Sequence, residues 1–212
     1  MIGDVINLEQ KHLNTAENIY KILKEKYNHD KKWTVGICGE SGSGKSVTAF
    51  ALKKVLEENG IKSLVIQMDD YFKLPPKTNH ENREKSFDNV GMHEVYLDLI
   101  QNNIKEFKDG KSTLKKPLVH YQNNFISEEI LDLQDVQVII IEGTYILSID
   151  DFDFSIFINR NYQDTFEKRI ERNRDEQSDF IEKVLNIEHN IIRQLKEKAD
   201  IVLGKNYEIV KP

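Results

Sequence analysis

The segment formed by residues 39–46, GESGSGKS, constrains the fold of this chain more than any other feature. It fits the pattern G-x-x-x-x-G-K-[ST] and follows directly on the apolar run of residues 33–38. In such a loop the glycines let backbone N–H groups approach a phosphate, the lysine reaches the β- and γ-phosphates, and the last hydroxyl is placed to bind Mg²⁺. The sequence therefore predicts a buried strand that leads into a phosphate-binding loop.

The residues after the loop predict a helix. Residues 47–58 place apolar side chains at helical spacing, and Gly60 follows as a stop signal. A strand, a loop and a helix in this order hold a nucleotide by its phosphates. We expect Lys45 also to serve catalysis and Ser46 also to bind Mg²⁺. The predicted nucleotide-binding residues are Gly39, Glu40, Ser41, Gly42, Ser43, Gly44, Lys45, Ser46 and Val47.

Composition narrows the class of protein. The 212 residues are 39% hydrophobic and 31% charged, which is typical of one soluble domain spanning residues 1–212. The net charge of −6, without a basic block, argues against nucleic acid as a partner, and no run approaches the ~20 apolar residues of a membrane span. The one cysteine, Cys38, precludes an internal disulfide. We therefore expect a cytoplasmic protein, with a homo-oligomer left open.

The order of predicted elements indicates an α/β fold. Apolar runs at residues 62–68, 136–141, 154–158 and 199–203 predict further strands, separated by helical patterns. Such alternation is typical of a parallel sheet with helices on both faces, which binds ligands beyond the carboxyl ends of its strands. We also expect additions to this core, which are an N-terminal helical extension over residues 1–30, a hairpin over 112–134 and a lid region over 160–190.

Carboxylates follow two of the predicted strands. Asp69 and Asp70 come after the second strand, and Glu142 closes the third. Phosphoryl transfer needs positioned phosphates and metal, neutralised charge, and an acceptor hydroxyl held near a base. An aspartate here is the candidate base and Glu142 the candidate metal-orienting group. The alternatives are an aspartate that caps the next turn and a glutamate that ends a strand in solvent.

The region after the fourth predicted strand is rich in arginine. One interpretation is a lid that closes catalytic arginines on the phosphates, and the other is a solvated helix face with ion pairs to Glu167, Glu171 and Asp175. The arginines concerned are Arg169, Arg172 and Arg174.

Two other classes of nucleotide-binding protein also have a phosphate-binding loop. One is a GTPase or ATPase switch or motor, which hydrolyses nucleotide to change shape. Its base-reading signature N-K-x-D is absent, and the D-x-x-G at residues 88–91 follows polar residues instead of a buried strand. A nucleotide-binding module without catalysis stays open.

Taken in order, the segments GESGSGKS, MDDYFK (68–73), SFD (86–88), VIIIEG (138–143) and ERNRD (171–175) resemble the uridine kinase and phosphoribulokinase family. The resemblance runs from about residue 32 to residue 203. It implies a P-loop kinase with a five-stranded parallel sheet, a helical lid and a small hairpin insertion. It also implies that ATP and Mg²⁺ are used to phosphorylate a hydroxyl group of a small molecule.

The resemblance also implies roles for individual residues. The first acid after the second strand is the proposed base of such kinases, so Asp69 is preferred to Asp70 as the base and is also a candidate metal ligand beside Ser46 and Glu142. Two alignments of the lid stay open, because the family's arginine pattern fits either residues 168–173 or residues 171–175. The candidate acceptor-binding residues are Tyr71 or Phe72, Phe87, Asp88 and Tyr121.

One segment departs from the family. Where uridine kinases read the pyrimidine with a tyrosine and a histidine, this chain has Val119 and Asn124, and Ile126 replaces an arginine. His120 or Tyr121 would shift into register only if the hairpin pairs differently. The departures predict that uridine and cytidine are poor acceptors, which leaves pantothenate, phosphoribulose, glycerate or a similar acceptor open.

Overall fold

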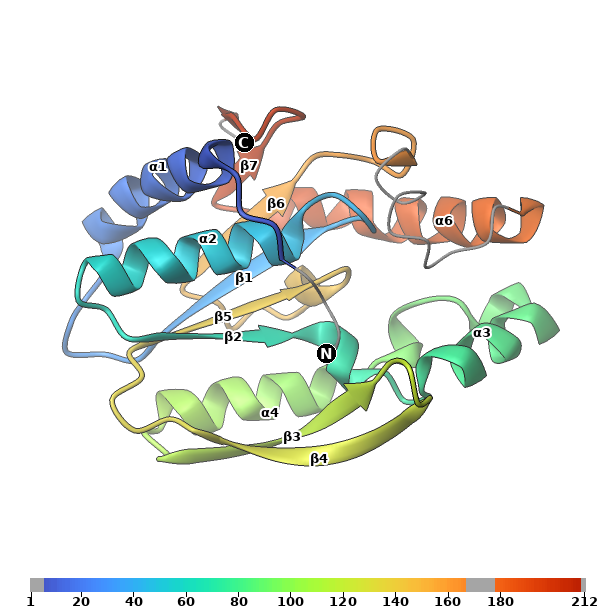
Figure 1. Ribbon diagram of the computed structural model, residues 1–212, viewed down its shortest axis with the longest axis horizontal. Coiled ribbons are helices and arrows are strands. Elements are labelled where there is room, and N and C mark those ends of the chain that lie inside the picture. Colours follow the sequence, from blue (N-terminus) through green and yellow to red (C-terminus); the bar gives the residue numbers. More distant parts are fainter. Residues whose placement is uncertain (1–5, 167–177, 211–212) are drawn as a thin grey trace.

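The core of the protein is a six-stranded sheet (Figure 1). The computed structural model describes residues 6–166 and 178–210. The strand order is β2-β5-β1-β6-β7-β8, with parallel pairing throughout except between β7 and β8. The predicted parallel sheet is confirmed, and the antiparallel edge strand β8 is an addition to it. The strands are β1 (Trp33–Gly39), β2 (Ser63–Gln67), β5 (Val138–Gly143), β6 (Phe154–Ile158), β7 (Ile201–Leu203) and β8 (Ile209–Val210).

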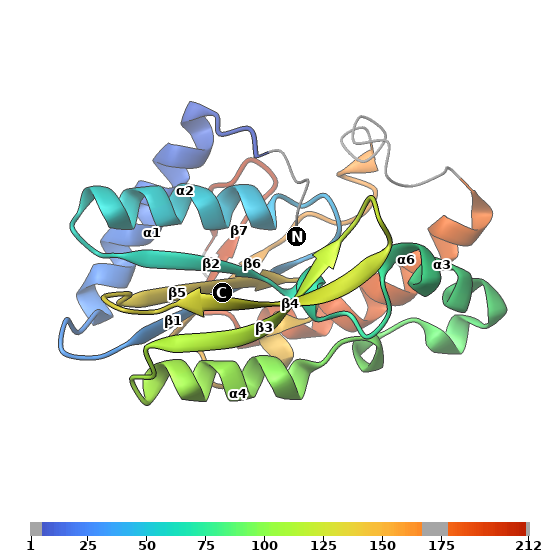
Figure 2. The ribbon, with the colours of Figure 1, turned by 60° about the horizontal axis from the view of Figure 1, so that its bottom comes forward.

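Helices cover both faces of this sheet, as Figure 2 shows for α2 and α4. Along β5, Val138 and Ile140 pack on the face covered by α1 and α2, whereas Ile139 and Ile141 pack on the face covered by α4 and the end of α6. An apolar run buried on both faces is the expected signature of a central parallel strand. The helices are α1 (Gln10–Lys26), α2 (Lys45–Glu58), α4 (Leu97–Lys108) and α6 (Asp179–Ile192).

Helix α1 belongs to the core. Its side chains Ala16, Ile19 and Leu23 are fully buried in the cluster that α2 shares with the sheet. The spacing of these residues places them on one helical face. Thr15 on the same helix donates a hydrogen bond from Oγ1 to the backbone oxygen of Tyr207 (3.1 Å). The N-terminal segment is therefore tied to the chain just before β8.

A second part of the fold lies outside the central sheet. It contains an antiparallel hairpin, β3 (Thr113–His120) and β4 (Phe125–Asp132), and the helix α3 (Pro76–Lys85). The polar sequence of α3 did not predict a helix. Its first turn is capped by a residue far along the sequence. The side chain of Asn124, at the hairpin turn, accepts hydrogen bonds from the N–H groups of Lys77 (2.8 Å) and Thr78 (3.4 Å). Short 3-10 helices connect these elements at η1 (Met68–Tyr71), η2 (Phe87–Asn89), η3 (Met92–Glu94), η4 (Ile146–Ser148) and η5 (Arg193–Lys198).

A buried ion pair anchors the hairpin to η1. Asp70 accepts from Lys116 Nζ (2.7 Å) and from the N–H of Val119 (3.0 Å), and both charged side chains are only 3% exposed. Lys116 also pairs with Glu129 across the hairpin (2.6 Å). Such a pair depends on both partners, since a lone buried charge is strongly unfavourable.

We expect Lys116→Met to lower the free energy of unfolding by ~3–5 kcal/mol, because the Asp70 carboxylate stays buried without its counter-charge. Denaturant unfolding of purified protein measures the loss. Lys115→Met is the matched control, since the Lys115 side chain is 61% exposed and pairs only on the surface with Glu128. Equal effects of the two substitutions would contradict the anchoring role of Lys116.

Candidate functional site

The phosphate loop joins the end of β1 to the start of α2, as predicted. Gly42 and Gly44 have positive φ angles of 73° and 103°, which favour glycine. The hydroxyl of Tyr207 occupies the space that a Cβ atom on Gly44 would need. Both this contact and the positive φ angle therefore exclude a side chain at Gly44. Helix α2 starts at Lys45 and points its unpaired N–H groups back into the loop, which is the arrangement that binds phosphate.

The end of β5 meets the start of α2 at Glu142. Ser46 Oγ donates to Glu142 Oε1 (2.8 Å), and Gln67 Nε2 at the end of β2 donates to the same oxygen (3.2 Å). Burial raises the pKa of the Glu142 carboxyl, the Lys45 charge opposes the rise, and the Asp69 charge adds to it. Two predicted metal ligands are thus in direct contact, with Lys45 and Asp69 within electrostatic reach.

The two aspartates after β2 lie in different environments. Asp69 is exposed at the start of η1, whereas Asp70 is 2% exposed and holds Lys116 and Val119. A base for an acceptor hydroxyl must be reachable by that acceptor, which favours Asp69. Asp70 instead has the contacts of a residue that positions the hairpin.

The predicted acceptor-binding residues divide in a similar way. Tyr71 is fully buried and donates from its hydroxyl to Asn103 Oδ1 (2.9 Å), so this side chain belongs to the core and Phe72 is the partly exposed alternative. Phe87 in η2 is 38% exposed and stacks on Phe180 at the start of α6, with ring centroids 5.5 Å apart.

Two further acceptor candidates lie on the surface. Asp88 in η2 is exposed, and its carboxylate accepts a hydrogen bond from Ser86 Oγ (3.1 Å). Tyr121 lies at the hairpin turn and is 38% exposed. The three candidate arginines of the lid, Arg169, Arg172 and Arg174, lie outside the described residues.

Contacts that sequence reasoning missed connect the site to α3 and α6. Arg83 of α3 donates from Nε and Nη2 to the two carboxylate oxygens of Glu94 (2.6 and 2.9 Å). Its Nη2 also donates to Glu188 of α6 (3.0 Å). His189, the next residue, bonds through Nδ1 to Glu40 Oε1 of the phosphate loop (2.6 Å). The sequence signal for these contacts was weak, because Glu188 and His189 lie among several other polar residues of the same helical stretch.

Two negative findings apply to residues 6–166 and 178–210. Within them, no group of three or more histidine, cysteine or acidic side chains is arranged to hold a metal ion by itself. Within the same ranges, no helix is long and apolar enough to cross a membrane. Mg²⁺ beside phosphates is usually held by one or two protein oxygens together with water and phosphate oxygens.

A family model described as "Phosphoribulokinase / Uridine kinase family" matches residues 34–203. The chain belongs to this family. It is therefore a P-loop kinase, and the predicted family and fold class are confirmed.

Individual relatives are distant. The chain is 28% identical over 193 residues to the bifunctional alpha-galactosidase/sucrose kinase AgaSK of Mediterraneibacter gnavus, covering 84% of this chain but only 21% of that longer protein. It is 25% identical over 191 residues to a uridine kinase of Leuconostoc citreum, covering 84% of this chain and 90% of the relative.

Solved structures agree on the fold of this kinase. A possible uridine kinase from Bacillus stearothermophilus superposes with a TM-score of 0.66 at 19% identity, over 89% of this chain and 97% of the other. A phosphoribulokinase from Rhodobacter spheroides gives a TM-score of 0.63 at 13% identity, over 82% of this chain and 70% of the other. At these identities the likeness supports the fold alone.

We expect Lys45→Ala to lower the turnover of this kinase by at least about 10²-fold, because Lys45 is the cation of the phosphate loop. The fold should persist, since the Nζ hydrogen bond of Lys45 is made to the Glu40 backbone oxygen within the same loop. An ADP-release assay with circular dichroism measures both. Lys53→Ala on the same helix is the control, because Lys53 pairs with Glu57 on the surface. Unchanged turnover in a folded Lys45→Ala protein would show that phosphate transfer occurs elsewhere.

Proposed function

We propose that this kinase transfers the γ-phosphate of ATP to a hydroxyl group of a small molecule, with Mg²⁺ as cofactor. The observation that carries the proposal is the hydrogen bond between Ser46 and Glu142, because it brings the phosphate loop and the carboxylate of the neighbouring strand together. Lys45 then neutralises charge on the phosphates as the bond to the leaving oxygen breaks.

The chemistry of the donor groups fits Mg²⁺. Ser46 offers a hydroxyl and Glu142 a carboxylate, and oxygen ligands beside phosphates are what this ion prefers. The raised pKa of Glu142 is the mark of a buried carboxylate that lacks full compensation. In this proposal Ser46 and Glu142 hold the cation, directly or through water, and the bound ion supplies positive charge to the phosphates.

Asp69 is the proposed base. It follows β2, which β5 separates from the strand β1 that leads into the phosphate loop, and it is exposed. An acceptor hydroxyl placed between Asp69 and the γ-phosphate loses its proton to the carboxylate as its oxygen bonds to phosphorus. This arrangement puts the acceptor next to η1, where Phe72 and Phe87 also belong to the candidate site.

We propose that the acceptor is not a pyrimidine nucleoside. Val119 is 2% exposed and its N–H is bonded to Asp70, while the Asn124 side chain holds the first turn of α3. Both residues at the expected pyrimidine-reading positions are thus used within the fold. The sucrose kinase named among the relatives adds a sugar to the other acceptors proposed here, which are pantothenate, phosphoribulose and glycerate.

Uridine remains the second candidate acceptor, because several relatives that are 25–28% identical to this chain are named uridine kinases. A coupled ADP-release assay over nucleosides, sucrose and other sugars, pantothenate, ribulose 5-phosphate and glycerate separates the two. Turnover that depends on an acceptor supports a kinase of that acceptor. Hydrolysis of ATP at the same rate with and without every acceptor would support a nucleotide switch instead.

Asp69→Asn should lower kcat by ~10²–10⁴-fold while the affinity for ATP changes only a few-fold, since a base acts on the acceptor. Asp70→Asn should mainly lower stability, because it leaves Lys116 without its buried partner. Steady-state kinetics and denaturant unfolding on both variants distinguish the roles. If Asp70→Asn is folded and inactive while Asp69→Asn is active, the base is misassigned.

Uridine and cytidine should be poor acceptors, with kcat/KM at least ~10²-fold below that of the true substrate, as expected when polar contacts to a base are missing. Steady-state kinetics with each nucleoside checks this. A kcat/KM on the order of 10⁴ M⁻¹s⁻¹ or better for either would restore a uridine kinase function.

A further inference from the structure

Glu40 places a carboxylate in a loop that binds anions. At close range a negative charge opposes phosphate binding, and the effect grows as water is excluded. The Glu40 residue is only 6% exposed, and its two oxygens are bonded to other parts of the chain. Oε2 accepts from the N–H of Tyr162 after β6 (2.7 Å), and Oε1 accepts from His189 Nδ1 of α6 (2.6 Å). Because a carboxylate only accepts, the ring of His189 carries its proton on Nδ1.

The backbone of Glu40 is engaged as well. Its carbonyl oxygen accepts a hydrogen bond from Lys45 Nζ (3.0 Å). The Lys45 ammonium has three N–H donors, so this bond leaves two of them for phosphate oxygens. The residue that His189 holds is therefore also the residue that positions the Lys45 ammonium.

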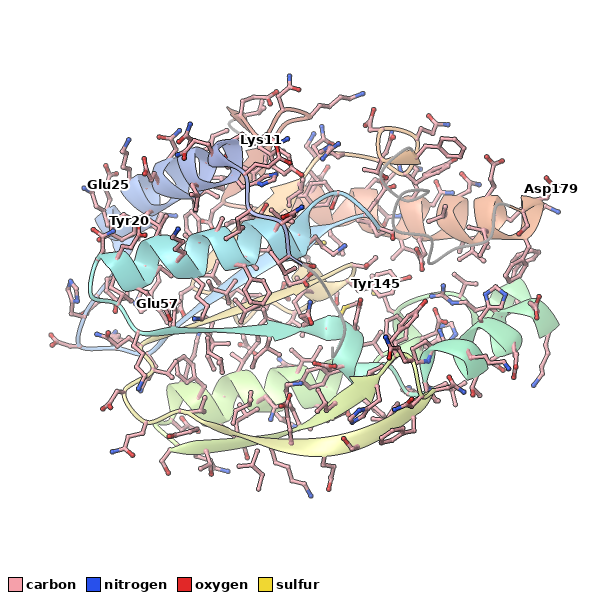
Figure 3. The ribbon with its side chains drawn as sticks, viewed as in Figure 1. Lys11, Tyr20, Glu25, Glu57, Tyr145 and Asp179 are labelled. Carbon is pink, nitrogen blue, oxygen red and sulfur yellow. The ribbon has the colours of Figure 1, made fainter. Side chains whose placement is uncertain are left out.

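Helix α6 also contacts residues 76–94, which we name the acceptor segment. Glu188 accepts from Arg83, which is itself bonded through both nitrogens to Glu94. These three side chains are at most 15% exposed. At the start of the helix, Phe180 stacks on Phe87. In Figure 3, Asp179 marks the end of α6 that lies over α3.

We propose that Glu40 and His189 are positioning residues. Through α6, they couple nucleotide binding at the phosphate loop to the position of the acceptor segment. Adjacent residues of one rigid helix, Glu188 and His189, contact the two halves of the site, so a shift at one contact moves the other. The inference rests on the proposed kinase function of the same site. It gives the carboxylate of Glu40 a role that phosphate binding alone does not explain.

Hydrogen exchange on the full chain tests the coupling, with and without Mg²⁺ and a non-hydrolysable ATP analogue. In the wild type, the analogue should slow exchange in residues 39–47, in α6 and in the acceptor segment. In His189→Ala, protection of 39–47 should remain, while the protection that the analogue adds to the acceptor segment should fall by about 5-fold or more, the usual scale of coupling between sites.

Two variants separate positioning from mere packing. His189→Asn offers an amide N–H near the place of Nδ1 and should restore most of the coupling. Gln194→Ala is the control, because the exposed Gln194 of η5 donates a hydrogen bond to the backbone oxygen of Asn190 in α6 and should behave as wild type. With an acceptor in hand, His189→Ala should lower kcat by ~10-fold or more while KM for ATP stays within a few-fold, because misplaced reactants slow the chemical step.

The outcomes separate this inference from the proposed function. If the analogue protects the acceptor segment equally in His189→Ala and in the wild type, the coupling role is wrong while the kinase function stands. If it does not protect residues 39–47 in the wild type, nucleotide binding at the loop fails, and both proposals fall together. Loss of coupling in His189→Asn and in Gln194→Ala alike would reduce His189 to a packing residue.

Discussion

The register of the parallel strands determines where every candidate group lies. Ile37 is opposite Glu142 on β5, and Glu142 is opposite Gln67 on β2. These three residues form a row across the sheet, near the carboxyl ends of the strands. Because parallel strands end at the same edge, this row brings the phosphate loop, Glu142 and the acids after β2 to one place. A shift of register by one residue would turn Glu142 to the other face of the sheet.

The elements predictable from the sequence are those whose signals are local. The phosphate loop and the apolar run of β5 contain their own pattern, since burial on both faces makes a strand apolar throughout. Helix α3 could not be predicted, because its capping oxygen comes from Asn124, which lies 46 residues further along the chain from Thr78. The edge strand β8 has only 2 residues, too few for a pattern.

The same distinction applies to the candidate site. Positions at strand ends indicated Asp69 and Glu142 as candidate site residues. The buried side chains of Asp70 and Tyr71, in contrast, are bonded to Lys116 and Asn103. Such partners lie on other elements, so a single sequence gives no hint of the pairing. Phe72, the next residue, is partly exposed, so the burial that distinguishes Tyr71 from Phe72 could not be read from the sequence.

The cap on α3 restricts how the acceptor side of this protein can change. Asn124 has a positive φ of 50°, a conformation that asparagine tolerates at a turn, and its side chain must reach the first turn of the helix. Adding one residue to each strand of the hairpin would carry the turn about 3.3 Å further out and uncap the helix. Substitutions along the hairpin keep this contact, whereas insertions break it. The side chains of the hairpin can therefore vary while its length stays fixed by the contact with α3.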